Sequence, residues 1–168
     1  MKDTKLFVVL PCYNEEEVLG ETSKRLLELY GKMISEGTVS PESKIVFVDD
    51  GSRDRTWEII SGLCEQNNIY RGVKLAHNAG HQNALLGGLM TVKDECDCAV
   101  SIDADLQDDV DAIDAMAEKR REGAHIVCGV RASRQTDTFM KRFTARAYYR
   151  IMPVSYTHLR AHETLMNL

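Results

Sequence analysis

The feature that most constrains the fold is a regular alternation between short apolar runs and longer segments with helical periodicity. The first two runs, Leu6 to Leu10 (LFVVL) and Lys44 to Val48 (KIVFV), consist almost entirely of apolar residues. Strands that are apolar on both faces are typical of parallel sheets covered by helices on both sides. We therefore predict an α/β domain with three layers, in which a mainly parallel sheet has helices on both faces.

The alternation continues along most of the chain. Further short runs predict strands from Tyr70 to Leu75, from Cys98 to Ile102 and from His125 to Val130. Helical spacing predicts a first helix with Val18, Thr22, Leu26, Leu29 and Met33 on one face, a second with Trp57, Ile60 and Leu63, and others from Asn78 to Val92, Val110 to Glu122 and Thr138 to Met152. Asn14 is placed to cap the first helix, with Glu17 three residues later in a capping-box-like position.

Polar residues gather where four of the predicted strands end. The clusters are Pro11 to Glu15, Asp49 to Asp54, His77 to His81 and Asp103 to Asp108. The carboxyl ends of parallel strands lie at one edge of a sheet, and ligands bind outside those ends. The clusters therefore predict one binding site.

Asp103 and Asp105 predict a metal site within this group. Residues two apart on a strand point the same way, so two carboxylates at a strand end can converge on one cation. Mg²⁺ and Mn²⁺ accept carboxylate oxygens and leave positions open for phosphate oxygens. Gln107 adds an amide oxygen with the same alternation. A solvated acidic turn is the alternative, but three other polar clusters at the same edge favour the metal site.

Two other clusters leave their roles open. Gly51, after Asp49 and Asp50, permits the positive φ of a tight turn. One of these aspartates can hold a base or ribose while the other caps the next helix, and an ordinary turn is the alternative. The segment from His77 to His81 leads into a helix start, where amide groups and imidazoles suit a diphosphate. Both histidines can equally be surface residues.

Basic residues follow the last predicted strand. Arg131 comes directly after it, and Lys141 and Arg142 lie on the last predicted helix. Guanidinium groups suit a phosphate acceptor. For the helix residues, a solvated basic face is the alternative.

Composition limits the partners and the compartment. The chain has 168 residues, enough for one domain with a hydrophobic core, and a formal net charge of -5. A nucleic-acid-binding domain usually has a basic surplus, so we expect no nucleic-acid partner. Five cysteines without a repeating framework fit a reducing cytosol. We find no signal peptide and no apolar run long enough for a membrane helix, so this segment is expected to be soluble.

Residues 153–168 depart from the alternation. The stretch from Val154 to Thr164 (VSYTHLRAHET) resembles a translated adapter sequence from sequencing-library preparation. We therefore predict one domain over residues 1–152, incomplete at its C-terminus, and a non-native tail over residues 153–168. A genuine polar tail is the alternative, and the DNA downstream of the Met152 codon would distinguish the two.

Together the motifs resemble the family-two glycosyltransferases with the GT-A fold. The motifs are Leu10 to Glu16 (LPCYNEE), Val48 to Thr56 (VDDGSRDRT), Asn78 to Ala84 (NAGHQNA), Asp103 to Asp108 (DADLQD) and Gly129 to Arg131 (GVR). Within the family, DADLQD and the basic stretch from Thr138 to Ala145 are most similar to polyprenyl-phosphate glycosyltransferases, of the dolichol-phosphate mannose synthase and bactoprenol glucosyltransferase types. Two positions depart from the pattern: Asp109 stands where proline is common, and His77 where arginine is common.

The resemblance implies a role for each cluster and a place in the cell. The implied nucleotide-binding residues are Pro11, Tyr13, Glu15, Asp50, Asn78 and Gly80. The implied metal ligands are Asp103, Asp105 and Gln107, of which Asp103 and Asp105 are also the implied catalytic residues. The implied acceptor-phosphate residues are Arg131, Lys141 and Arg142. Mg²⁺ or Mn²⁺ is the implied cofactor. The full-length protein is expected at the cytoplasmic face of a membrane, with further acceptor-binding and membrane segments beyond this chain.

The implied reaction moves a hexose, with inversion, from a UDP- or GDP-linked sugar to a polyprenyl phosphate. A phosphate monoester has a second pKa near ~6, so this acceptor can attack at neutral pH without a general base. One alternative is a related enzyme with a sugar hydroxyl acceptor, which needs a carboxylate base. Another is that this truncated chain is a nucleotide-sugar-binding module without turnover. A receiver domain is disfavoured because its acidic pair is expected after the first strand, and a nicotinamide-binding domain because no G-x-G-x-x-G follows Leu6 to Leu10.

Overall fold

The computed structural model describes residues 4–105, 110–130 and 164–167. The chain forms two compact units, Met1–Glu118 and Lys119–Leu168. The first unit contains β1 (Leu6–Cys12), α1 (Leu19–Ser35), β2 (Lys44–Asp49), α2 (Thr56–Gln66), β3 (Tyr70–Lys74), α3 (His81–Val92) and β4 (Cys98–Ser101). The helix α4 (Ala112–Arg121) crosses the boundary, and the second unit contains β5 (Val127–Val130) and β6 (Thr164–Asn167). No helix within the described ranges is long and apolar enough to cross a membrane.

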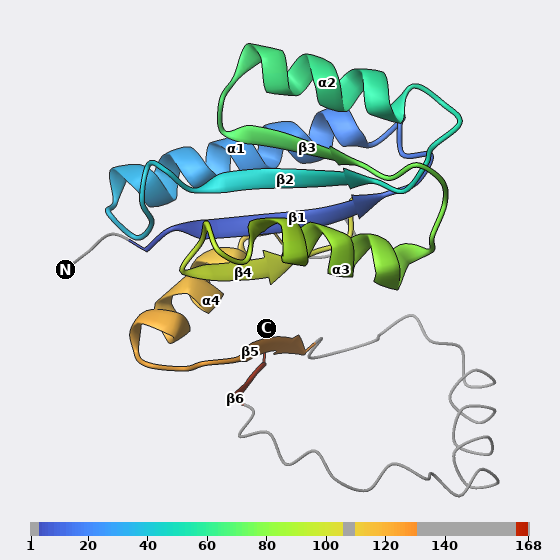
Figure 1. Ribbon diagram of the computed structural model, residues 1–168. Helices are drawn as coiled ribbons and strands as arrows, with labels where there is room; N and C mark the ends of the chain where they lie inside the picture. The colour runs from blue at the N-terminus through green and yellow to red at the C-terminus, as the bar shows by residue number, and fades with distance from the viewer. Residues whose placement is uncertain (1–3, 106–109, 131–163, 168) are drawn as a thin grey trace, which may run out of the picture. The chain divides into compact units, whose positions relative to one another are not determined.

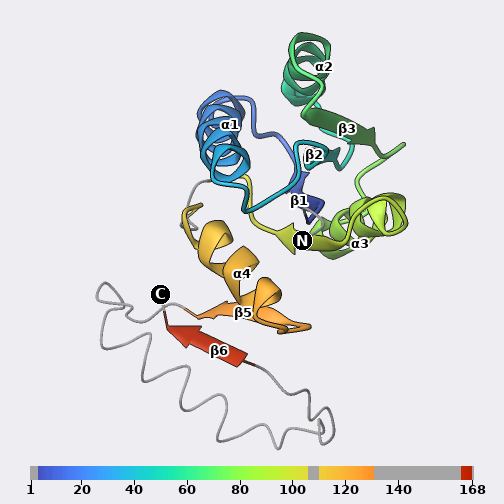
Figure 2. The same cartoon turned by 90° about the vertical axis from the view of Figure 1, so that its left-hand side faces the viewer.

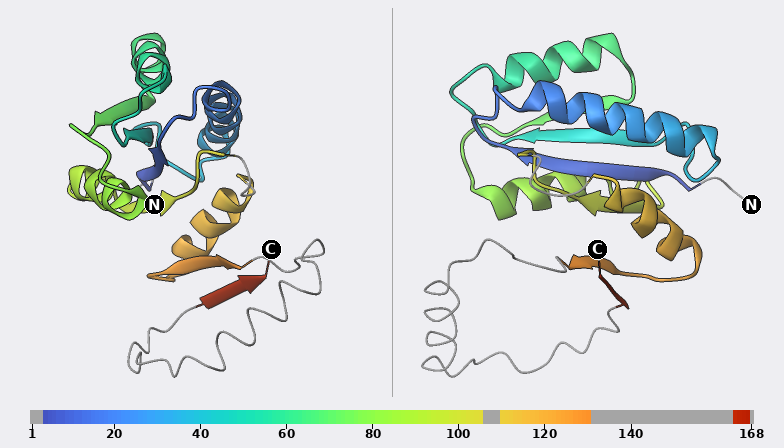
Figure 3. Two further views of the ribbon diagram at one scale, coloured as in Figure 1. Left: turned by 90° about the vertical axis from the view of Figure 1, so that its right-hand side faces the viewer. Right: turned by 180° about the vertical axis from the view of Figure 1, so that it is seen from behind.

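The four strands of the first unit form one parallel sheet in the order β3-β2-β1-β4. At the end of β1, Cys12 is paired with Asp49 of β2. Because the strands run in the same direction, their carboxyl ends meet at one edge, toward which the arrowheads point in Figure 1. The left view of Figure 3 faces this edge. The loops that carry the predicted polar clusters leave the sheet here.

One face of the sheet packs against α1 and α2. Leu6, Val8 and Leu10 of β1 point to this face and are almost completely buried. Their buried neighbours include Leu26, Leu29, Tyr30 and Met33 of α1 and Ile60 of α2. Burying one such aliphatic side chain contributes about 1.5–3 kcal/mol to folding, so this row fixes α1 on the sheet. The helical spacing predicted from the sequence is confirmed here.

The other face is covered by α3. Phe7 and Val9 of β1 pack with the buried Ala84 of α3. Gly88 allows the helix to approach closely, since a Cβ atom there would lie 2.6 Å from Val48 Cγ2 and 2.7 Å from Val9 Cγ1. Figure 2 shows α1 and α2 on one side of the strands and α3 on the other. The predicted three-layer α/β architecture is therefore confirmed.

The helices α1 and α3 begin later than the sequence predicts. Asn14 does not cap α1, which starts at Leu19 with no side-chain hydrogen bond at its cap. Instead, Asn14 has a left-handed backbone (φ 56°), and its Oδ1 accepts a hydrogen bond from Arg53 N–H at 2.9 Å. Likewise, α3 starts at His81 rather than Asn78. Asn14 thus joins two loops, whereas Asn78 Oδ1 accepts a hydrogen bond from Gly80 N–H within its own loop.

The sequence predicts that β5 is a fifth strand of the main sheet. This prediction is wrong, because β5 belongs to a separate sheet. It pairs in parallel with β6 in a two-stranded sheet, with Val127 opposite Thr164 and Val130 opposite Asn167. The segment that contains β6 was predicted to have no regular element. An apolar run predicts a strand but not its partner, which explains the difference. The predicted helix from Thr138 to Met152 lies outside the described residues.

Candidate active site

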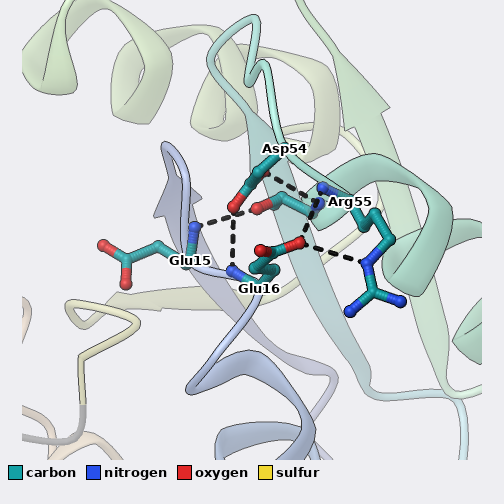
Figure 4. Close-up of polar contacts among 5 residues, drawn as sticks. Glu15, Glu16, Asp54 and Arg55 are labelled. Carbon is teal, nitrogen blue, oxygen red and sulfur yellow. Dashed lines mark hydrogen bonds and ion pairs between the residues drawn. The ribbon is translucent and has the colours of Figure 1, made fainter.

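The loops after β1 and β2 interlock through charged side chains (Figure 4). Asp54 accepts hydrogen bonds from Glu16 N–H at 3.2 Å and from Thr56 N–H at 3.0 Å. In return, Glu16 accepts hydrogen bonds from Arg55 N–H at 3.1 Å and Arg55 Nε at 3.2 Å. Burial opposes ionisation of Asp54, but the hydrogen bonds from Thr56 and Glu16 outweigh it and lower its pKa. These contacts fix the first loop against the start of α2.

Glu15 is held by its backbone, and its carboxylate points away from this network (Figure 4). Its N–H donates to Thr56 Oγ1 at 2.8 Å. Burial raises the pKa of the Glu15 carboxyl group, and the negative charges of Asp105, Asp54 and Asp103 raise it further. The residues after β4 therefore lie close enough to Glu15 for their charges to interact.

The donors around Glu15 fit a hard divalent cation. They are carboxylate oxygens, which Mg²⁺ and Mn²⁺ prefer, and a bound cation would relieve their repulsion. Within the part of the chain that the structure describes, no group of three or more His, Cys, Asp or Glu side chains is placed so that it could hold a metal ion. Mg²⁺ is commonly held by one or two carboxylates together with substrate phosphates. Asp103 and Asp105 fit such an open site, and Gln107 lies outside the described residues.

The two aspartates at the end of β2 are buried and support the loops. Asp50 is 2% exposed, and its two oxygens accept hydrogen bonds from Ala79 N–H at 2.7 Å and Gly80 N–H at 2.9 Å. Asp49 is 0% exposed and accepts a hydrogen bond from Ser52 N–H at 3.0 Å. Neither caps α2, whose first N–H is bonded to Asp54. Asp50 thus holds the loop that carries two other predicted nucleotide-binding residues.

Gly51 brings the loops after β2 and β3 together. It has the predicted positive φ, 68°. A Cβ atom at this position would lie 2.7 Å from both Asn78 N and His77 C, so any larger residue would displace the neighbouring backbone. The segment from His77 to Gly80 therefore rests directly on the turn after β2.

His81 connects the start of α3 with the end of β4. Its Nε2 lies 3.5 Å from Asp103 Oδ1, and the two side chains are 57% and 58% exposed. All four predicted clusters are thereby linked at one edge of the sheet, as the sequence predicted.

The remaining predicted nucleotide-binding residues differ in their exposure to solvent. Pro11 is buried within β1, opposite Val48, whereas Tyr13 follows the strand and is 40% exposed. The three predicted acceptor-phosphate residues, Arg131, Lys141 and Arg142, lie outside the described residues.

Sequence reasoning missed the supporting residues. It assigned no role to Glu16, Asp54, Arg55 or Thr56, although they hold the Glu15 loop. The signal for these residues was their membership of the motifs Leu10 to Glu16 and Val48 to Thr56. The sequence did not indicate their contacts, because the partners lie about 40 positions apart along the chain, as do Glu16 and Asp54.

Comparison with known proteins identifies the family. Residues 7–167 match the family described as Glycosyl transferase family 2. The chain belongs to this family.

Curated relatives agree with this assignment. The chain is 53% identical over 147 residues to the uncharacterized glycosyltransferase YkoT of Bacillus subtilis (strain 168), a match that covers 88% of this chain and 44% of that protein. It is 35% identical over 147 residues to the prophage bactoprenol glucosyl transferase homolog of Escherichia coli (strain K12), covering 88% of this chain and 45% of that protein. The chain thus spans less than half the length of these relatives.

A solved structure shares the fold. The crystal structure of S. aureus TarS matches with a TM-score of 0.55 and 19% identity, over 80% of this chain and 23% of that chain. The chain therefore contains the α/β unit of a family-two glycosyltransferase, and the resemblance noted in the sequence is confirmed.

Proposed function

We propose that the protein transfers a hexose, with inversion, from a nucleoside-diphosphate sugar to a polyprenyl phosphate, with Mg²⁺ or Mn²⁺. The observation that supports this most is that hydrogen bonds and the contact between His81 and Asp103 link the four polar loops at the carboxyl edge of one parallel sheet. Membership of the family supports glycosyl transfer, and the relative named as a bactoprenol glucosyl transferase homolog supports a lipid phosphate acceptor.

The nucleoside would lie between the loops after β1 and β3. The exposed ring of Tyr13 suits stacking on a base. The carboxylate of Glu15 suits hydrogen bonds from ribose hydroxyl groups. The loop of Asn78 and Gly80, fixed by Asp50, would line the other side.

The diphosphate would lie over Asp103 and Asp105, which with Gln107 would hold the cation. When bound, the cation supplies positive charge that offsets the charge developing on the leaving diphosphate. The start of α3 lies beside Asp103 through His81, and amide groups at a helix start attract phosphate oxygens.

The acceptor phosphate would attack the anomeric carbon from the side opposite the leaving group. One C–O bond forms to the acceptor oxygen as the C–O bond to the diphosphate breaks, and the nucleoside diphosphate leaves with the electron pair. No proton has to move, because a phosphate monoester with a second pKa near ~6 is largely dianionic at neutral pH. Arg131, with Lys141 or Arg142, would hold the acceptor phosphate.

Two alternative functions differ from this proposal, one in its acceptor and the other in its lack of turnover. A sugar hydroxyl acceptor would need an Asp or Glu base on the acceptor side. A binding module would hold the nucleotide sugar without turnover.

Donor binding is the first test. We expect calorimetric titration of the chain with UDP and GDP to show binding of one of them that tightens when Mn²⁺ is added. Binding of neither nucleotide, with or without Mn²⁺, would contradict the proposed donor site.

Acceptor use is the second test. We expect incubation of the full-length protein with the preferred nucleotide sugar to yield a glycosylated lipid with a polyprenyl phosphate and no product with free sugars. Arg131→Ala should impair use of the lipid phosphate, and a rise only in the KM for the donor would exclude its acceptor role. Product formation only with a sugar acceptor would favour the first alternative, and donor binding without turnover the second.

A further inference from the structure

His81 and Asp103 face each other across two loops that the fold holds in place. The two side chains are more than half exposed, with 3.5 Å between His81 Nε2 and Asp103 Oδ1. Exposed ion pairs usually contribute little to stability, because water screens them. We therefore expect this contact to affect the orientation of Asp103 rather than the stability of the fold.

The backbone of His81 is fixed by the residues before and after it. Asp50 binds the N–H groups of Ala79 and Gly80, which directly precede His81. Three residues beyond His81, Ala84 is completely buried against the sheet. The imidazole therefore starts from a backbone position that is set by buried contacts.

The backbone of Asp103 is fixed as well. Ile102 N–H donates to Val9 O at 3.3 Å, which continues the pairing of β4 with β1. Ala104 is buried, and its carbonyl oxygen accepts a hydrogen bond from Thr22 Oγ1 at 2.8 Å. The carboxylate of Asp103 can still rotate, and this carboxylate is the group that His81 faces.

We propose that His81 is a positioning residue for the cation site: its imidazole holds one oxygen of Asp103 and leaves the other directed at the cation. This inference rests on the proposed function, in which Asp103 is a cation ligand. Carboxylates that bind a metal are commonly held by an outer hydrogen-bonding partner, and loss of such a partner lowers metal affinity. The sequence motif Asn78 to Ala84 gave no indication of this role, because Asp103 lies 22 positions after His81.

The test measures Mn²⁺ affinity directly, by electron paramagnetic resonance of free Mn²⁺ in the presence of the preferred nucleoside diphosphate. His81→Ala is expected to weaken Mn²⁺ binding by roughly tenfold, the lower end of the range for outer partners, because the pair is exposed. His81→Gln, which keeps an N–H donor, is expected to retain most of the affinity. Gln82→Ala changes the exposed neighbour of His81 on α3 and should leave Mn²⁺ affinity unchanged.

Two further readouts separate positioning from a general structural effect. Thermal unfolding and nucleotide affinity without metal should be the same for His81→Ala and the wild-type chain. Unchanged Mn²⁺ affinity in His81→Ala overturns the positioning role. So does an equal loss in His81→Gln, or a loss of metal-free nucleotide affinity as large as the loss of Mn²⁺ affinity. If the wild-type chain binds nucleotide but no Mn²⁺, the cation site of the proposed function fails too. If the wild-type chain binds Mn²⁺ and the His81 variants bind it equally well, only the role of His81 is excluded.

Discussion

The two sides of the candidate site are built in different ways. On the side of β1 and β2, the carboxylates of Asp54, Glu16 and Asp50 accept hydrogen bonds from backbone N–H groups of neighbouring loops. On the side of β4, Asp103 is more than half exposed and faces a side chain, His81, at 3.5 Å.

This difference separates support from ligand binding. A carboxylate whose oxygens accept hydrogen bonds from backbone N–H groups stabilises the fold, because its removal leaves those groups without an acceptor. A carboxylate at an exposed strand end remains available to a ligand. Substitutions on the first side should therefore lower stability, and those on the second should lower affinity for metal and nucleotide.

The largest effect is expected from Asp105→Ala, on the exposed side. It should abolish the gain in nucleoside-diphosphate affinity that Mn²⁺ gives, because one of two proposed metal carboxylates is lost. Calorimetric titration with and without Mn²⁺ measures this gain. Asp94→Ala, which removes an exposed aspartate before β4, is the matched control. An undiminished gain in Asp105→Ala would place the metal elsewhere.

The next largest effect is expected from Gly51→Ala, on the supporting side. A left-handed backbone costs a non-glycine residue about 1–2 kcal/mol, and the added Cβ would also push against Asn78 and His77. We expect lower stability in chemical denaturation together with weaker nucleotide binding.

Gly37→Ala is the control for Gly51→Ala. Gly37 has a similar φ, 69°, but a Cβ atom there would meet nothing within 4 Å. The difference between the two variants isolates the close approach of the loops, and equal losses would show that this approach contributes nothing.

A smaller effect is expected from Asp54→Ala. The N–H groups of Glu16 and Thr56 lose their acceptor, so we expect a loss of about 1 kcal/mol in the free energy of unfolding. Glu17→Ala, an exposed acidic residue nearby, should change little.

The pH dependence of Asp54 has a definite sign. Because the pKa of Asp54 is lowered in the fold, its contribution is present above the ordinary Asp value and is lost as the pH falls through the lowered value. Asp54→Ala should therefore differ from the wild-type chain at neutral pH and converge with it in acid. A constant difference across this range would contradict the hydrogen-bonded carboxylate.

The smallest effect on stability is expected from Glu15→Gln, whose position joins the two sides. The pKa of Glu15 is raised in the fold, so the wild-type chain should lose some stability as the pH rises from below the ordinary Glu value to above the raised value. Glu15→Gln removes this loss and should be at least as stable at neutral pH, while its nucleotide affinity falls. A variant that is less stable at neutral pH would show that the carboxylate supports the fold.

Much of the fold and the general place of the site could be predicted from the sequence. Apolar runs such as Leu6 to Leu10 determine buried strands locally, and four polar clusters at strand ends predict a shared edge. The roles within that edge could not be predicted. Asn14 has the residue type of a helix cap, but its partner, Arg53, comes from another part of the chain. Asp54 binds Thr56 N–H at the start of α2, but it also binds the distant Glu16 N–H. The pairing of β5 with β6 escaped prediction for the same reason.

The strand order has a further consequence for how such a site can diversify. The chain adds β2 and β3 on one side of β1 and then returns to add β4 on the other. Such a reversal leaves a crevice between neighbouring strand ends. Its location is a property of the order in which the strands are laid down and does not depend on the loop residues. Loops at the reversal can therefore change the ligand that they bind while the layers beneath keep their arrangement.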